Sequence, residues 1–232
     1  ALEGGIKLVL LNTPMNPCSK VFSSSELEKI AALLVKYNAI AICDEVYEHL
    51  VYQGAEHIPL MTIPGMRNRA IRIGSAGKTF SLTGWKVGYI TACPELLTPL
   101  TRTHQFLTFT TPPNLQAGAA FGLRKKADYF FGLSNELEKR RDQLARGLSE
   151  VGMEVLKCDG TYFITADFRG TGFHGDDLQF CEHITEQARV AAVPVSAFYE
   201  GGDVKYFARF CFCKEEDTLS EAVNRLQGHF DC

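Results

Sequence analysis

A single lysine, Lys78, stands between a glycine and a threonine in the stretch IGSAGKTFSLTGWKVGY, residues 73–89. The order G-K-T occurs in nucleotide-binding loops, where the lysine holds phosphates, but a lysine after an apolar run can also form a covalent bond to a carbonyl group. A phosphate-binding loop runs directly into a helix. Here two glycines and a strand-like pattern follow, and Arg72 occupies the position of the loop's first glycine. The sequence therefore favours covalent chemistry at Lys78.

Further polar side chains follow or begin apolar runs. They are Asn12 and Asn16 after the first run, Asp44 and Tyr47 after the second, Ser75 after the third and Lys86 at the start of the fourth. Open α/β sheets bind ligands at the carboxyl ends of their strands, so we expect these side chains to converge there. Taken singly, each has an ordinary structural explanation, such as a turn, a cap or core packing. Their joint spacing indicates a ligand site.

Pyridoxal phosphate is a ligand that needs this set of groups. Its aldehyde requires a lysine, and a carboxylate keeps its ring nitrogen protonated. An amide and a phenol can hydrogen-bond its ring oxygen, while a hydroxyl and a cation can hold its phosphate. We therefore expect pyridoxal 5'-phosphate as the cofactor.

The first half of the chain predicts a βαβ arrangement. Four apolar runs, Ile6–Leu11, Ala39–Cys43, Ala70–Gly74 and Val87–Ala92, have the length of strands. Between the first two, SSSELEKIAALLVKYN carries a cap at Ser25 or a neighbour and apolar residues at helical spacing. This pattern is typical of an α/β fold with a partial, doubly wound, mostly parallel sheet.

The second half is helical at first and then mixed. Helices are predicted over residues 94–107 and 114–127, followed by a long helix from Asp128 to Val151. Two strand–helix groups follow, with a helix over Asp176–Ala188 and a last helix from Glu215. We expect residues 1–125 to form the C-terminal part of a large cofactor-binding domain, and residues 126–232 to form a smaller α+β domain that begins with the long helix.

Six segments in order resemble the class I aminotransferases of pyridoxal-phosphate fold type I, and most closely their kynurenine, glutamine and methionine branch. They are NTPMNP, DEVY, SAGKTFSLTGWKVGY, GTYFITAD, AVPVSAFY and ARFCFCKEEDTL. The similarity runs from about Ile6 to Leu226. The resemblance implies transamination between an L-amino acid and a 2-oxo acid, with kynurenine-like or other aromatic amino acids, methionine or glutamine as donors. It also implies a homodimer.

The resemblance further implies a role for each matched residue. Lys78 corresponds to the lysine that binds the cofactor and moves the substrate's proton, and Asp44 to the partner of the ring nitrogen. Asn16 and Tyr47 correspond to the residues that hold the cofactor's ring oxygen. The remaining three are Ser75 and Lys86 as phosphate ligands, and Arg209 as the arginine that binds the substrate's α-carboxylate. Asn16 is expected to bind substrate as well as cofactor.

Side-chain preference rests on the segment HQFLTFTTPPNLQ. Relatives specific for dicarboxylates carry an additional arginine there, whereas this chain has none and offers Phe109. An aromatic lip favours apolar or aromatic substrates, although Phe109 could equally pack in a core. Tyr162 and Phe163 are further candidates for the same pocket.

Composition limits the other possible functions. Hydrophobic residues make up 46%, charged residues 22%, and the net charge is −3, so neither nucleic acid nor an anionic membrane is an expected partner. The eight cysteines contain no C-x-x-C pair, so we expect no metal and predict buried free thiols in a reducing compartment, the cytoplasm or else a mitochondrion or plastid.

The chain begins abruptly with a strand, so we expect it to be the C-terminal portion of a longer aminotransferase. The missing portion would complete the large domain and the cofactor pocket. Two alternatives to transamination stay open. One is a cysteine-S-conjugate β-lyase that uses the same cofactor, and the other is a truncated product with little cofactor affinity and no activity of its own.

Overall fold

The computed structural model describes residues 1–230, which divide into two compact units. The first unit contains residues 1–14 and 21–131, and the second contains residues 15–20 and 132–230. The division falls inside helix α5 (Ala127–Glu150), and the short segment Met15–Lys20 packs with the second unit. The predicted domain boundary at residues 125/126 stays a prediction.

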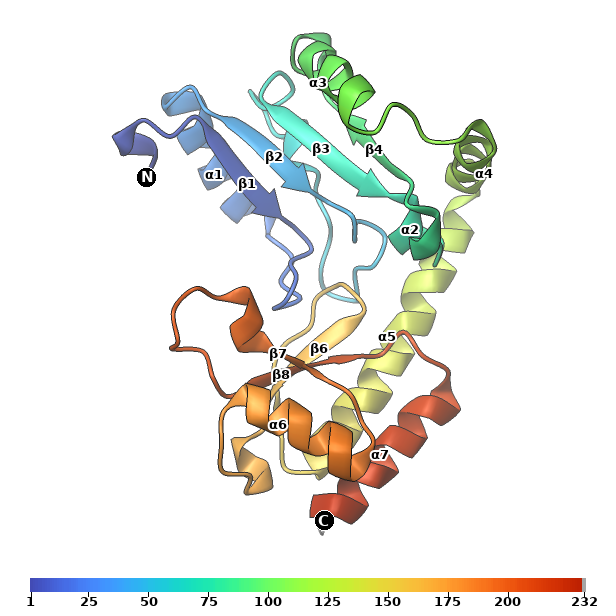
Figure 1. The fold of residues 1–232 in the computed structure, drawn as a ribbon. Helices are drawn as coiled ribbons and strands as arrows, with labels where there is room; N and C mark the ends of the chain where they lie inside the picture. Colours follow the sequence, from blue (N-terminus) through green and yellow to red (C-terminus); the bar gives the residue numbers. More distant parts are fainter. Residues whose placement is uncertain (231–232) are drawn as a thin grey trace. The chain divides into compact units, whose positions relative to one another are not determined.

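A four-stranded sheet in the order β1-β2-β3-β4 organises the first unit (Figure 1). Strands β1 (Leu8–Asn12), β2 (Ile40–Asp44) and β3 (Ala70–Ser75) are parallel, and β4 (Gly88–Thr91) pairs antiparallel with β3. The parallel part of the sheet confirms the α/β expectation. The three parallel strands end at Asn12, Asp44 and Ser75, so these three of the polar residues predicted to converge lie along one edge of the sheet.

Helix α1 (Ser24–Lys36) covers one face of this sheet (Figure 1). Ser23, rather than Ser25, caps it, and the Ser23 and Glu26 side chains each accept a hydrogen bond from the other's backbone N–H, a capping box. Its apolar stripe of Leu27, Ala31 and Leu34 is buried against small residues of the strands, including Ala41, Cys43 and Ala70. Small side chains on the sheet let the helix approach closely.

The rest of the first unit is helical and irregular. Helix α2 has only four residues (Ala76–Thr79), and the chain then passes through a single 3₁₀ turn into β4, so Lys78 does not begin a long helix. Helices α3 (Pro94–Leu107) and α4 (Pro113–Leu123) follow. Phe80 packs against Tyr129 and Phe130 at the start of α5, with ring centroids 5.9 and 6.2 Å apart.

The second unit contains an antiparallel sheet in the order β5-β6-β8-β7. Its strands are β5 (Glu154–Val155), β6 (Phe163–Asp167), β7 (Val193–Pro194) and β8 (Phe207–Cys211). Helix α6 (Asp177–His183) continues as one π-helical turn to Ala188, and α7 (Glu216–Phe230) is the last helix. Phe168 and Phe180 stack in the core with ring centroids 4.1 Å apart.

Close packing between α5 and α7 depends on a glycine. A Cβ atom at Gly147 would lie 2.3 Å from Cγ2 and 3.0 Å from Cβ of Val223, whose branched side chain has little freedom to move. Gly132, in the same helix, has no atom within 4 Å of the corresponding position. Alanine substitutions at the two glycines therefore distinguish the effect of an added methyl group on packing from its effect on helix propensity.

We expect Gly147→Ala to lower the free energy of unfolding by roughly 1–3 kcal/mol, because overpacking outweighs the gain in helix propensity. The matched variant Gly132→Ala should raise it by about 0.5–1 kcal/mol. Urea unfolding followed by circular dichroism measures both. Equal stabilisation by the two substitutions would mean that α5 and α7 are not in contact at Gly147.

Candidate active site

Lys78 lies in a cavity at the carboxyl end of β3. The cavity has a volume of about 330 Å³ and is lined by Ser75, Gly77, Lys78, Thr83, Lys86, Val87 and Gly88. Three of the predicted site residues, Ser75, Lys78 and Lys86, thus share one cavity. Lys78 is half-buried and Lys86 is exposed. A hydroxyl and two ammonium groups make this cavity suited to an anionic ligand.

The turn that carries Lys78 packs its backbone closely against neighbouring residues. A Cβ at Gly77 would lie 3.1 Å from Cα of Thr83 and 3.3 Å from Oγ of Ser75, so only glycine leaves this corner open. Lys86 has a φ of 55°, a left-handed conformation, and ends the 3₁₀ turn Thr83–Trp85. The hydroxyl Oγ1 of Thr79 is buried and has no hydrogen-bond partner among the described residues.

Tyr47 and Asp44 approach the lysine from the end of β2. The Nζ atom of Lys78 lies 5.6 Å from the centroid of the buried Tyr47 ring. Asp44 is the last residue of β2 and is paired in register with Asn12 of β1 and Ile73 of β3. Its Oδ1 accepts a hydrogen bond from the backbone N–H of Val46, 3.3 Å away. The carboxylate is half-buried at the strand end, where the sequence predicted it.

A buried charged cluster, which the sequence analysis did not identify, holds the turn that carries Asp44 and Tyr47. Glu45 is fully buried, and its carboxylate accepts hydrogen bonds from Nε of Arg72 (2.6 Å) and the backbone N–H of Leu60 (3.3 Å), with Nε2 of His57 3.2 Å away. Arg72 also donates to Glu48, which in turn accepts from the Tyr89 hydroxyl at 2.9 Å.

This cluster has a clear positional consequence. Glu45 follows Asp44 directly, and Glu48 follows Tyr47, so one guanidinium from β3 binds both flanking carboxylates. The planar fork of arginine suits such bridging, whereas the ammonium of a lysine would act as a single point. Burial raises the pKa of Tyr89, so it remains a neutral hydroxyl that can donate to Glu48. The available sequence signal was an arginine inside the apolar run of β3, together with the acidic residues Asp44 and Glu45 at the end of the preceding apolar run.

Arg209 and Asn16 lie together in the second unit. Arg209 is half-buried on β8, and its guanidinium carbon lies 4.5 and 4.9 Å from the ring centroids of Phe163 and Phe198. An NH1 group donates to the side-chain oxygen of Asn16. Stacking between two aromatic rings fixes the plane of the guanidinium, which is what bidentate carboxylate binding requires.

The loop that carries Asn16 is fastened to β6. The buried hydroxyl of Ser19 lies 3.0 Å from Oγ1 of Thr161 and donates to the Phe163 carbonyl at 2.8 Å. The Thr165 hydroxyl donates to the Pro17 carbonyl at 3.1 Å. Ser19 has a φ of 58°, where a glycine would be unstrained. The side-chain hydrogen bonds of Ser19 offset that strain.

Phe109 does not pack in a core. It lies between α3 and α4 with 73% of its surface exposed and a φ of 63°. The structure therefore excludes the core-packing alternative for this side chain, while its role as a pocket lip stays a prediction. Tyr162 meets Phe163 edge-on, with centroids 5.5 Å apart, next to the ring on which Arg209 stacks.

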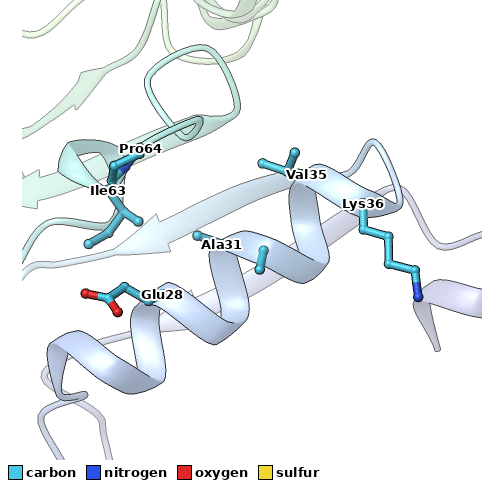
Figure 2. Close-up of a pocket in the computed structure, with 7 residues that line it drawn as sticks. Glu28, Ala31, Val35, Lys36, Ile63 and Pro64 are labelled. Carbon is cyan, nitrogen blue, oxygen red and sulfur yellow. The ribbon is translucent and has the colours of Figure 1, made fainter.

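A second hollow in the first unit lacks comparable chemistry. It has a volume of about 490 Å³ and is lined by residues of α1 together with Ile63 and Pro64. Figure 2 shows Ala31 and Val35 on the helix near these two residues, and Lys36 directed away.

Among residues 1–230, no helix has the length and apolar character needed to span a membrane. In the same range, no three His, Cys, Asp or Glu residues gather as a metal site would require.

The fold and the strand-end lysine together define a protein of the pyridoxal-phosphate transferase class. The chain belongs to the Aminotransferase class I and II family, whose match spans residues 1–226. The family uses pyridoxal phosphate as its cofactor, and the residues around Lys78 fit that group: a lysine, a hydroxyl and a second cation in one cavity, with a carboxylate at the neighbouring strand end.

Two curated relatives indicate the breadth of this similarity. The mouse kynurenine–oxoglutarate transaminase 3 is 41% identical over 234 residues, which cover 93% of this chain and 51% of the relative. The methionine aminotransferase of Escherichia coli is 35% identical over 221 residues, covering 95% of this chain and 57% of the relative. The chain thus spans little more than half the length of these relatives.

Solved structures agree. The N-succinyldiaminopimelate aminotransferase of Mycobacterium tuberculosis superposes with a TM-score of 0.92 at 41% identity, over 96% of this chain and 58% of that one. The three relatives are therefore named for three different substrates, although all of them match this chain over more than nine tenths of its length.

The charged cluster around Glu45 gives a direct test. We expect Arg72→Met to lower the free energy of unfolding by about 3 kcal/mol, because it leaves the buried Glu45 carboxylate without its strongest partner. The double variant Arg72→Met/Glu45→Gln should lose only about 1 kcal/mol, because the fully buried Glu45 charge is removed together with its partner and Glu48 keeps the hydrogen bond from Tyr89.

Chemical denaturation of the two single variants and the double variant forms a complete cycle. Arg67→Met, at an exposed position before β3, is the control and should change stability by less than about 0.5 kcal/mol. Additive effects of Arg72 and Glu45 would contradict a coupled, buried pair.

Proposed function

We propose that the protein catalyses pyridoxal-phosphate-dependent transamination between an L-amino acid and a 2-oxo acid. The observation that carries the proposal is the placement of Lys78 in a cavity with Ser75 and Lys86, beside the buried ring of Tyr47. When bound, the cofactor supplies an electron sink that stabilises the carbanion formed at the substrate's Cα. The protein's part is to hold that group, orient the substrate and move one proton.

The residues of the first unit provide attachment and proton transfer. The ε-amino group of Lys78 would hold the cofactor covalently and, once free, would take the proton from the substrate's Cα. Asp44, at the strand end, would hydrogen-bond the cofactor's ring nitrogen. Ser75 and Lys86 would hold the phosphate, and Tyr47 would orient the ring oxygen. The bridge from Arg72 to Glu45 and Glu48 keeps Asp44 and Tyr47 in place.

The residues of the second unit provide substrate orientation. The Arg209 guanidinium, stacked on Phe163 and Phe198, binds the α-carboxylate through two parallel hydrogen bonds. Asn16, its hydrogen-bonded neighbour, contributes to the same site and to the cofactor's ring oxygen. This carboxylate anchor would fix the position of the substrate's α-carboxylate and so limit the orientations of the bonds at Cα.

The donor amino acid has an uncharged or aromatic side chain in this proposal. The exposed Phe109 and the absence of an arginine in residues 104–116 support kynurenine, other aromatic amino acids, methionine or glutamine. The names of the relatives add N-succinyldiaminopimelate as a donor to be tested. The assembly in this proposal is a homodimer with active sites at the interface. Release of pyruvate and ammonia from a cysteine conjugate would instead identify a β-lyase.

Covalent attachment of the cofactor tests the central residue. After incubation with pyridoxal phosphate and borohydride reduction, peptide mass mapping should find the adduct on Lys78, with a visible absorption band before reduction. Lys78→Ala should lose both, while Lys125→Ala, which removes an ammonium that lies over Phe121 and Tyr129, should keep both. Label spread evenly over surface lysines would show that this chain does not assemble the site.

Substrate kinetics test Arg209. We expect Arg209→Ala to raise the KM for the amino acid by about 100-fold, corresponding to roughly 3 kcal/mol of lost binding, with a smaller effect on kcat. The KM of Arg209→Lys should lie between those of the unsubstituted protein and Arg209→Ala, because an ammonium keeps the charge but cannot form the bidentate contact. Arg169→Ala is the control, since Arg169 is exposed and pairs with Asp167. An unchanged KM in Arg209→Ala would remove Arg209 from the substrate site.

A further inference from the structure

Two exposed cysteines lie side by side at the end of β8. Cys211 is the last residue of the strand, Cys213 follows two residues later, and their sulfur atoms are 3.5 Å apart. They differ from Cys43, Cys158 and Cys181, which are buried singly in the two units. None of the residues assigned to transamination is a cysteine, so this pair has no role in the proposed activity.

Alternation along the strand explains the arrangement. Phe210 and Phe212 point into the core, with 3% and 0% of their surface exposed, so the residues between and after them point outward on the same side. The backbone N–H of Phe212 donates to the Tyr162 carbonyl at 3.0 Å, which continues the pairing past the strand end. The two thiols are therefore held together by a backbone that core packing fixes.

The separation is within reach of a disulfide bond. Residues two apart in an extended strand have Cα atoms roughly 6.6 Å apart, near the upper end of the range that disulfides span. The sulfur atoms need to approach by only about 1.5 Å to reach the bonding distance. Because the last ladder pair joins Phe163 and Cys211, the exposed Cys213 can shift toward Cys211 without breaking a described ladder pair.

The electrostatic surroundings activate one of the two thiols. The hydrogen bond from the Cys213 thiol lowers the pKa of Cys211 to about 6, with help from the positive charges of Lys214 and Arg209. The same interaction raises the pKa of Cys213. Burial, in contrast, raises the pKa of Cys43 and Cys181 to about 12 and that of Cys158 to about 11. Thiolates, not thiols, are the nucleophiles in oxidation.

We propose that Cys211 and Cys213 form a peroxide-reactive dithiol that closes reversibly to an intrastrand disulfide. The Cys211 thiolate attacks one oxygen of hydrogen peroxide, the O–O bond breaks, and sulfenic acid and hydroxide form. The Cys213 sulfur then attacks the sulfenic sulfur, the S–O bond breaks, and the departing hydroxide leaves as water with the Cys213 proton. Two electrons pass from the sulfurs to the peroxide, and a dithiol reductant reverses the change.

The structure provides a convenient readout, because trypsin cleavage after Arg209 and Lys214 releases both cysteines in the single peptide Phe210–Lys214. The reduced protein is treated with one equivalent of hydrogen peroxide, blocked with N-ethylmaleimide and digested without reductant. We expect this peptide to lose about 2 mass units, the two hydrogens of a closed disulfide, and to carry no maleimide. Dithiothreitol before blocking should restore two maleimides. Cys18 and Cys93, which are half-buried, should remain alkylated after the same dose.

Two variants separate the roles of the sulfurs. In Cys213→Ser, oxidation should stop at a Cys211 sulfenic acid that dimedone labels, and in Cys211→Ser, Cys213 should react at least about tenfold more slowly than Cys211 does in the unsubstituted protein. Both positions are exposed, and circular dichroism checks that both variants fold. A peptide that keeps two maleimides, or disulfides that join either cysteine to a different one, would overturn the proposal. So would a Cys213→Ser protein that dimedone does not label.

Discussion

The buried carboxylate of Glu45 is the constraint on which the first unit depends. A fully buried charge is tolerated only when it is paired and hydrogen-bonded, and Glu45 has an arginine, a histidine and a backbone N–H around it. Meeting this requirement ties β3, which carries Arg72, to the turn after β2. That turn carries Asp44 and Tyr47, so neutralising one buried charge also positions two site residues.

In the second unit, ring contacts and hydroxyl hydrogen bonds position the predicted site residues Arg209 and Asn16. Here the rings of Phe163 and Phe198 lie against the guanidinium of Arg209, the predicted substrate-binding arginine. The Asn16 loop is held through hydroxyl groups, those of Ser19, Thr161 and Thr165, which reach backbone carbonyls and one another. Arg209 and Asn16 are thus positioned mainly by ring contacts and by hydrogen bonds of neutral groups.

Strand β8 combines two kinds of chemistry on one short element. Phe210 in the strand and Phe212 just past its end are core, and Arg209, Cys211 and Cys213 occupy the opposite side. The period of two that places the arginine toward its rings also places the two thiols next to each other. The proposed substrate anchor and the proposed oxidisable pair thus share one alternating pattern, in which the core residues determine where the polar ones point.

Much of this could be predicted from local sequence. The predicted strand and helix spans agree with the structure to within a few residues, because periodicity and apolar runs report on burial. The strand-end positions of Asp44 and Ser75 followed from the same pattern, since a parallel sheet brings the carboxyl ends of its strands to one edge. The motif order around Lys78 identified the family, because each segment carries residues that one cofactor needs.

Other features depended on pairing across the fold. The link from Arg72 to Glu45 and Glu48 joins positions more than twenty residues apart, and nothing in either local segment specifies the partner. The same holds for the contact between Ser19 and Thr161 and for the exposure of Phe109. The sequence by itself determined which elements form and which chemical groups stand at their ends, because these depend on neighbours along the chain. Only the tertiary structure decided which charges pair and which side chains are buried, because those depend on strand register and packing between distant segments.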